Sequence, residues 1–61
     1  IEVFKLNTRL FPDEPNVWDS LGEAYMNKGE NEKAIENYKK VLELAPNNPN
    51  AKKMLEKLGN K

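Results

Sequence analysis

The chain has 61 residues, with ten basic and ten acidic side chains and neither cysteine nor histidine. A chain of this length hides only about 60% of the surface that its unfolded form exposes, so its core is small. No disulfide is possible, and a zinc site of the Cys/His type is excluded. The zero net charge gives no electrostatic reason to expect nucleic acid or a membrane surface as a partner.

Targeting signals are absent from the residues given. No apolar run approaches the length of a membrane-spanning helix, and no signal peptide is visible. The chain begins with Ile1 rather than methionine, so we expect a processed product or a fragment of a longer protein. The lack of cysteine is compatible with the cytoplasm and favours it slightly, without identifying the location.

The first segment runs from Ile1 to Phe11 and carries apolar residues on a wide face at helical spacing. Ile1, Phe4 and Phe11 lie on one stripe of that face. The segment should end before Pro12, because the residue that precedes a proline is pushed out of the helical region. The pattern predicts one helix.

The second segment runs from Pro15 to Lys28, with proline in the first turn, where its missing N–H costs nothing. Four residues follow one another at i, i+3, i+4 and i+7, which is the spacing of one helix face. They are Trp18, Leu21, Gly22 and Tyr25. Gly29 is placed to end this helix in a left-handed conformation.

Two more helices are predicted, over Asn31–Ala45 and Pro49–Leu58. Asn47 or Asn48 can cap the last one. No segment alternates apolar and polar residues as a strand would. The sequence therefore predicts an all-α fold of about four helices.

A shift of the sequence by 34 residues places eight identical residues in register. A fixed period of this length is typical of helical repeat proteins. The pairs are Ile1/Ile35, Glu2/Glu36, Lys5/Lys39, Leu10/Leu44, Pro12/Pro46, Pro15/Pro49, Asn16/Asn50 and Leu21/Leu55.

At this period the chain resembles the tetratricopeptide repeat, whose pattern is Trp-x2-Leu-Gly-x2-Tyr, then Ala-x3-Phe, then Pro. One position departs from it, since Tyr38 stands where the pattern has phenylalanine. The matching repeat-core residues are Trp18, Leu21, Gly22, Tyr25, Ala34, Tyr38 and Pro46.

The resemblance implies antiparallel helix hairpins stacked into an α-α superhelix, as a single domain over residues 1–61. Residues 15–48 would form the complete repeat, residues 1–12 the second helix of a partial repeat, and residues 49–58 a capping helix. Gly22 and Ala34 would let two helices approach closely. A lone hairpin cannot bury both its faces, so neighbours must stack on it.

Residues for catalysis are lacking. Ser20 is the only serine, and no histidine is present to activate it. Carboxylate pairs such as Asp19 with Glu23 are interpreted as part of a solvated surface, because a small helical stack offers little shelter for a raised pKa. We therefore expect no enzyme activity, no cofactor and no metal site.

The resemblance instead implies a non-catalytic protein–protein interaction or scaffolding module. First helices in this family line a concave groove that holds a peptide or a partner's helix. Asp19 and Glu23 disfavour the anion-gripping mode known in chaperone-binding members and favour a basic or mixed apolar segment. The alternative is that these side chains are merely hydrated. The groove positions are Asn16, Asp19, Ser20, Glu23, Met26 and Asn27.

The first segment would lack the helix that normally covers it, so Ile1, Phe4 and Phe11 are expected to be partly uncovered. Two copies would then cover each other's open faces as a homodimer. The alternative is that the chain is a C-terminal appendage of a larger enzyme, such as a bacterial hydrolase, and packs on or positions its catalytic domain. A third alternative is an engineered repeat fragment.

Overall fold

The computed structural model describes residues 1–59; residues 60–61, the last two of the predicted single domain, lie outside the described part. No strand occurs within residues 1–59, so the all-α prediction is confirmed. The helices are α1 (Glu2–Leu10), α2 (Pro15–Lys28), α3 (Asn31–Leu44) and α4 (Pro49–Gly59).

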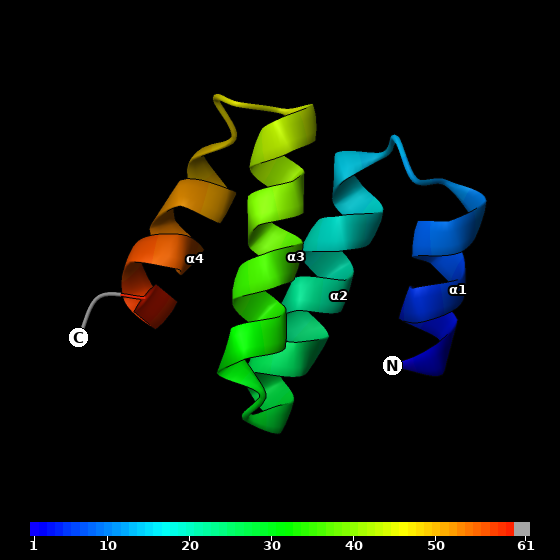
Figure 1. Ribbon diagram of the computed structural model, residues 1–61, viewed down its shortest axis with the longest axis horizontal. Coiled ribbons are helices and arrows are strands. Elements are labelled where there is room, and N and C mark those ends of the chain that lie inside the picture. Colours follow the sequence, from blue (N-terminus) through cyan, green and yellow to red (C-terminus); the bar gives the residue numbers. More distant parts are fainter. Residues whose placement is uncertain (60–61) are drawn as a thin grey trace.

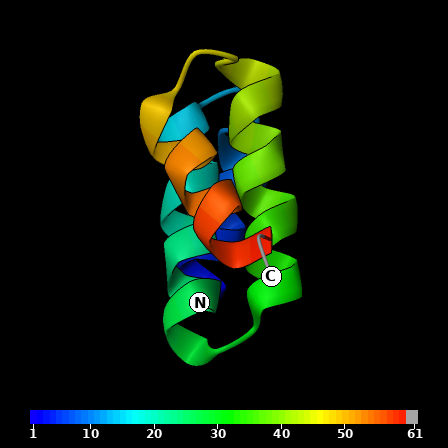
Figure 2. The same ribbon diagram turned by 90° about the vertical axis from the view of Figure 1, so that its left-hand side faces the viewer.

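The four helices lie side by side in chain order, each antiparallel to the one before (Figure 1). Helices α2 and α3 form the most extensively packed pair, α4 packs on α3, and α1 has the smallest interface, with α2. A view turned by 90° shows α2 and α3 on opposite sides, with α4 in front of them (Figure 2). The Cα extents of 33 × 26 × 12 Å describe a thin slab, so every helix keeps one face at the surface.

The turn between α2 and α3 depends on Gly29, whose φ of 89° lies in the left-handed region. Its N–H donates to the Met26 carbonyl at 3.0 Å, and the Glu30 N–H donates to the Tyr25 carbonyl at 2.9 Å. This pair of bonds is the Schellman arrangement, which satisfies the carbonyls at the end of a helix. The predicted stop at Gly29 thus has its expected backbone conformation.

The remaining helix ends differ from the prediction by a residue at most. Helix α3 ends at Leu44 because Ala45 leaves the helical region, although its N–H still donates to the Val41 carbonyl at 2.7 Å. Of the two candidate caps for α4, Asn48 is the one used: its Oδ1 accepts a bond from the Ala51 N–H at 3.0 Å.

The core lies mainly between α2 and α3 and includes one residue of α4. Its buried apolar residues are Leu21, Tyr25, Ala34, Tyr38, Val41 and Ala51. Gly22 is buried against the Tyr38 ring, and a Cβ placed on it would lie 3.1 Å from Cε2 and Cζ of that ring. Only a glycine at this position lets α2 and α3 approach this closely without displacing the tyrosine.

Candidate partner-binding groove

A pocket of about 180 Å³ opens between α2 and α4, with Tyr38 of α3 contributing to its wall. Four residues predicted for the groove line it, and three further residues complete it. The lining residues are Asp19, Ser20, Glu23, Met26, Tyr38, Asn50 and Met54. Asn16 and Asn27, also predicted for the groove, are exposed residues of α2 that do not line this pocket.

The pattern of α2 explains how one helix serves both the core and the pocket. Asp19, Glu23 and Met26 follow each other at i, i+4 and i+7, so they share one face. Leu21 and Tyr25 turn toward the buried side. The same helix therefore anchors the fold and presents two carboxylates beside a thioether.

Asp19 is held in place from the neighbouring helix. The Asn50 side-chain amide of α4 donates to both carboxylate oxygens of Asp19, at 3.1 Å and 3.2 Å. This contact joins residues 31 positions apart in the sequence. It fixes the spacing of α2 and α4 at the pocket and occupies the side of the carboxylate that faces α4.

Tyr38 is 1% exposed, yet it lines the pocket. Its hydroxyl makes no hydrogen bond within residues 1–59. In the same range, every buried side-chain nitrogen or oxygen that solvent cannot reach has a hydrogen-bond partner. The hydroxyl therefore opens onto the pocket. Burial, followed by the charges of Asp19 and Glu23, raises the pKa of Tyr38 to about 12, so the phenol stays protonated at neutral pH.

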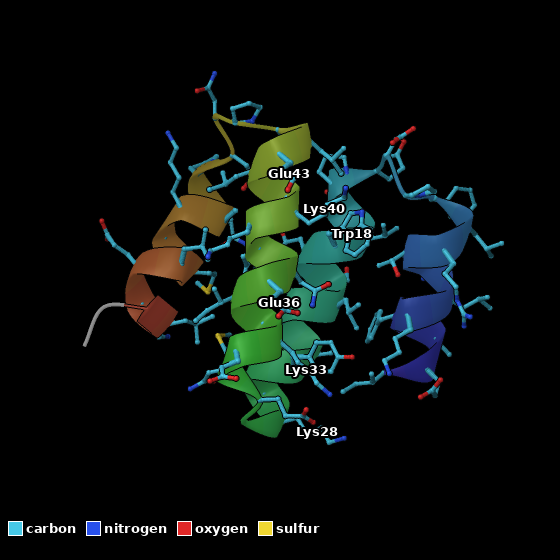
Figure 3. The ribbon with its side chains drawn as sticks, in the orientation of Figure 1. Trp18, Lys28, Lys33, Glu36, Lys40 and Glu43 are labelled. Atoms are coloured by element: carbon cyan, nitrogen blue, oxygen red, sulfur yellow. The ribbon has the colours of Figure 1, made fainter. Side chains whose placement is uncertain are left out.

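A different surface lies at the α2–α3 turn, where a shallower hollow of about 300 Å³ is lined by residues 29–33. Glu30 contacts the ammonium groups of Lys33 at 3.2 Å and Lys28 at 3.4 Å. The pKa of Glu30 is lowered by Lys33 first and then by Lys28. Figure 3 places both lysines at this end of the molecule. The charges pair locally, and we assign no ligand to this hollow.

The aromatic residues of α2 are accounted for by packing. The Trp18 indole N–H donates to the Pro12 carbonyl at 2.8 Å, which ties α2 to the preceding loop. Figure 3 shows Lys40 of α3 beside Trp18. The Lys40 ammonium lies 5.6 Å from the Trp18 ring centre, and the Lys33 ammonium lies 5.5 Å from the Tyr25 ring centre. Trp18 is half-buried and packs against the core.

The other repeat-core residues are placed as follows. Leu21, Gly22, Tyr25, Ala34 and Tyr38 are all buried between α2 and α3. Pro46 is exposed in the turn that follows α3. Val41 is also a core residue, although it is not among the residues of the repeat pattern.

Helix α1 leaves a large apolar surface uncovered. Val3 is 69% exposed, Leu10 59% and Phe11 54%, and Leu6 and Phe4 are also exposed. Ile1, in contrast, is half-buried and packs against the core. We call Val3, Phe4, Leu6, Leu10 and Phe11 the open α1 face.

The 34-residue period pairs each position of α1 with a position of α3, so the exposure of the two helices can be compared. Phe4 corresponds to Tyr38, which is 1% exposed, and Val3 corresponds to Asn37, which is 8% exposed. The α3 positions are covered because other helices pack on α3, whereas α1 contacts α2 alone to any extent. The exposure of α1 therefore goes with its packing against one helix, whereas α3 packs against two.

Residues 1–59 contain no group of three or more acidic, cysteine or histidine side chains placed to hold a metal ion. None of the helices described in this range has the length and apolar character needed to cross a membrane.

Comparison with known proteins gives one match. A family model for the tetratricopeptide repeat matches residues 16–48, which is more than half of the chain and covers α2, α3 and the turn that follows. No curated protein matches the chain. No solved structure matches it either.

Proposed function

Because the chain belongs to the tetratricopeptide repeat family, whose repeats typically act as non-catalytic protein-interaction modules, we propose that it binds a segment of a partner protein in the groove between α2 and α4. We further propose that residues 15–48 are the complete repeat that forms this groove. In this proposal residues 1–12 are the second helix of a partial repeat and residues 49–58 cap the stack.

The observation that supports the proposal is the character of the pocket. It places Asp19 and Glu23 beside Met26 and Met54, so it combines negative charge with flexible apolar side chains. Such a pocket repels an anionic chain end and favours a basic or mixed apolar segment. Asn16 and Asn27 lie at the two ends of α2, where a longer segment would pass over them.

Binding to an array of twelve-residue peptides with basic, acidic and apolar positions tests this groove. The double variant Asp19→Lys, Glu23→Lys should bind basic peptides at least tenfold more weakly, because it replaces electrostatic attraction with repulsion. The matched control is Glu32→Lys, Glu36→Lys, which makes the same charge change at exposed positions of α3. Undiminished binding by the groove variant, with helicity intact, would contradict the assignment.

A second proposal concerns the open α1 face. We propose that two copies of the chain cover this face for each other, since the corresponding surface of α3 is buried by neighbouring helices. Of the residues expected there, Phe4 and Phe11 are exposed and Ile1 is not. Sedimentation at increasing concentration tests it, and a monomer throughout would exclude the homodimer.

The alternative, that the chain is an appendage of a larger enzyme such as a hydrolase, assigns the same face to a catalytic domain. The chain would then position that domain and perform no chemistry itself. The reading frame upstream of Ile1 distinguishes the two. An upstream hydrolase domain whose contacts protect α1 from hydrogen exchange would favour the appendage over the homodimer.

A further inference from the structure

The pocket between α2 and α4 has an arrangement of polar atoms that is more specific than its overall charge. We propose that it is a subsite for one lysine side chain of the partner, with the ammonium group held between Asp19, Glu23 and the Tyr38 hydroxyl. This inference rests on the proposed function and adds to it the identity of the anchoring side chain.

The Tyr38 hydroxyl is the first argument. Tyr38 stands where the family pattern has phenylalanine, so its side chain adds one polar atom to a wall that would otherwise be apolar. The residue is 1% exposed, and its hydroxyl has no hydrogen-bond partner within residues 1–59 although it opens onto the pocket. Solvent reaches the hydroxyl through the pocket, so it is free to pair with a ligand there. A ligand that donates a hydrogen bond would be such a partner.

The surrounding groups define the chemistry of that ligand. The phenol is protonated at neutral pH, and its oxygen can accept a hydrogen bond from a donor. Asp19 and Glu23 supply negative charge on the same wall. Three separate acceptors around one space suit an ammonium group, which has three donors and no acceptor. Met26 and Met54 line the same space and suit the aliphatic stem of a lysine.

The contact between Asn50 and Asp19 favours lysine over arginine. A guanidinium binds best when its planar fork meets both oxygens of one carboxylate. Both oxygens of Asp19 already accept from Asn50, at 3.1 Å and 3.2 Å. The remaining lone pairs can each accept a single bond from an ammonium, which needs no planar approach. Asn50 therefore acts as a positioning residue that sets the preference.

NMR titration of the whole chain with three small probes tests the subsite directly. The probes are the Nα-acetyl, N-methylamide derivatives of lysine, arginine and norleucine, the last having a similar stem without the charge. The lysine probe should shift the amide signals of Asp19, Glu23 and Asn50. It should bind at least threefold more tightly than the arginine probe, and the norleucine probe should cause no saturable shift.

Two variants connect this preference to the named atoms. Tyr38→Phe restores the residue of the family pattern and should weaken the lysine probe about tenfold, the usual effect of losing a hydrogen bond to a charged group. Tyr25→Phe is the matched control, since Tyr25 is buried but does not line the pocket. Asn50→Ala frees the Asp19 carboxylate. It should therefore increase the affinity for the arginine probe and reduce or abolish the preference for lysine.

The outcomes separate the subsite from the groove. Equal binding of the lysine and norleucine probes, or an unchanged affinity in a folded Tyr38→Phe variant, would overturn the lysine subsite. If basic peptides still bind the wild type and this binding is lost in the Asp19→Lys, Glu23→Lys variant, the groove proposal stands without the lysine subsite. If the lysine probe binds as expected but no peptide does, the subsite stands and the proposed function fails.

Discussion

At the scale of single residues, the contact between Gly22 and Tyr38 connects the core to the pocket. The absence of a side chain at Gly22 lets the Tyr38 ring lie against α2, and a Cβ would lie 3.1 Å from it. The same packing directs the hydroxyl end of the ring to the pocket between Asp19 and Glu23. One close approach between two helices thus determines where a polar atom opens onto the groove.

We expect Gly22→Leu to destabilise the protein by about 3 kcal/mol, because a large side chain between α2 and α3 overpacks the core. In a chain of this size that loss is a large part of the total stability. Gly59→Ala is the control, since nothing lies within 4 Å of a Cβ at that position, and it should stay within about 0.5 kcal/mol. Thermal unfolding followed by circular dichroism measures both, and equal melting temperatures would refute the role of the close approach.

The buried phenol of Tyr38 makes stability depend on alkaline pH. Its pKa is raised from 10.0 to about 12, so the folded chain keeps a proton that the unfolded chain loses in this range. The free energy of unfolding should therefore be unaffected by this group below pH 10 and should fall as the pH rises from 10 toward 12. The loss is on the order of 2 kcal/mol.

Urea unfolding of wild type and Tyr38→Phe at several pH values between 8 and 12 isolates this effect. The wild type should lose stability relative to the variant across the upper part of the range. Other titrating groups, including the lysines, are common to both proteins and cancel in the difference. Parallel pH profiles would show that the Tyr38 phenol is not desolvated as the structure indicates.

At the scale of helices, local signals determine where each element begins and ends. Asn48 caps α4 through its Oδ1, which accepts from the Ala51 N–H at 3.0 Å, and Ala51 is fully buried in the core. The cap therefore also holds the residue that anchors α4 to the rest of the protein. Since Asn50 and Met54 of α4 line the pocket, the groove depends on this short helix keeping its place.

Asn48→Ala should destabilise the protein by about 1 kcal/mol, the usual effect of removing a helix cap. Asn47→Ala is the matched control: Asn47 is exposed and its side chain makes no hydrogen bond within residues 1–59. Chemical denaturation of the two variants gives the comparison. Equal midpoints would mean that the Asn48 side chain does not cap α4 in solution.

At the scale of the whole molecule, the chain is a thin slab with an uncovered end. The core lies around α2 and α3, α4 packs on α3, and α1 keeps its open face toward solvent. Such an end is expected for a stack of helical repeats, because each repeat buries its apolar surface only against its neighbours. The open α1 face is thus the largest apolar surface that the described residues leave exposed, and it is the surface that the dimer proposal uses.

We expect Leu6→Lys with Leu10→Lys to convert a dimer at high concentration into a monomer, because the two lysines place charge on the open α1 face. Helicity should be retained, since both residues are exposed in the single chain. The control Asn31→Lys with Asn47→Lys adds the same charge at exposed positions outside α1 and should remain dimeric. Sedimentation equilibrium gives the masses, and a wild type that is already monomeric would end the dimer proposal.

The helices and the family could be predicted from the sequence because their signals are local or periodic. Pro15, Gly29 and Pro49 punctuate the chain wherever they occur, and the 34-residue period needs no knowledge of contacts. The four groove residues Asp19, Ser20, Glu23 and Met26 followed from their register in the repeat, and they line one pocket. Asn50 and Met54 also line this pocket and were not among the predicted residues, although Asn50 could have been noticed as the counterpart of Asn16.

The order of helices, their ends and the membership of the repeat family were thus determined by the sequence alone, since each depends on residues close together or at a fixed spacing. Only the tertiary structure decided that Tyr38 opens onto the groove, that Asn50 holds Asp19, and that Val3, Leu6 and Leu10 are more exposed than Ile1. These features depend on the distance and angle at which separate helices meet. That geometry is fixed by how side chains such as Gly22 and Tyr38 fill the space between helices, which no spacing along the chain expresses.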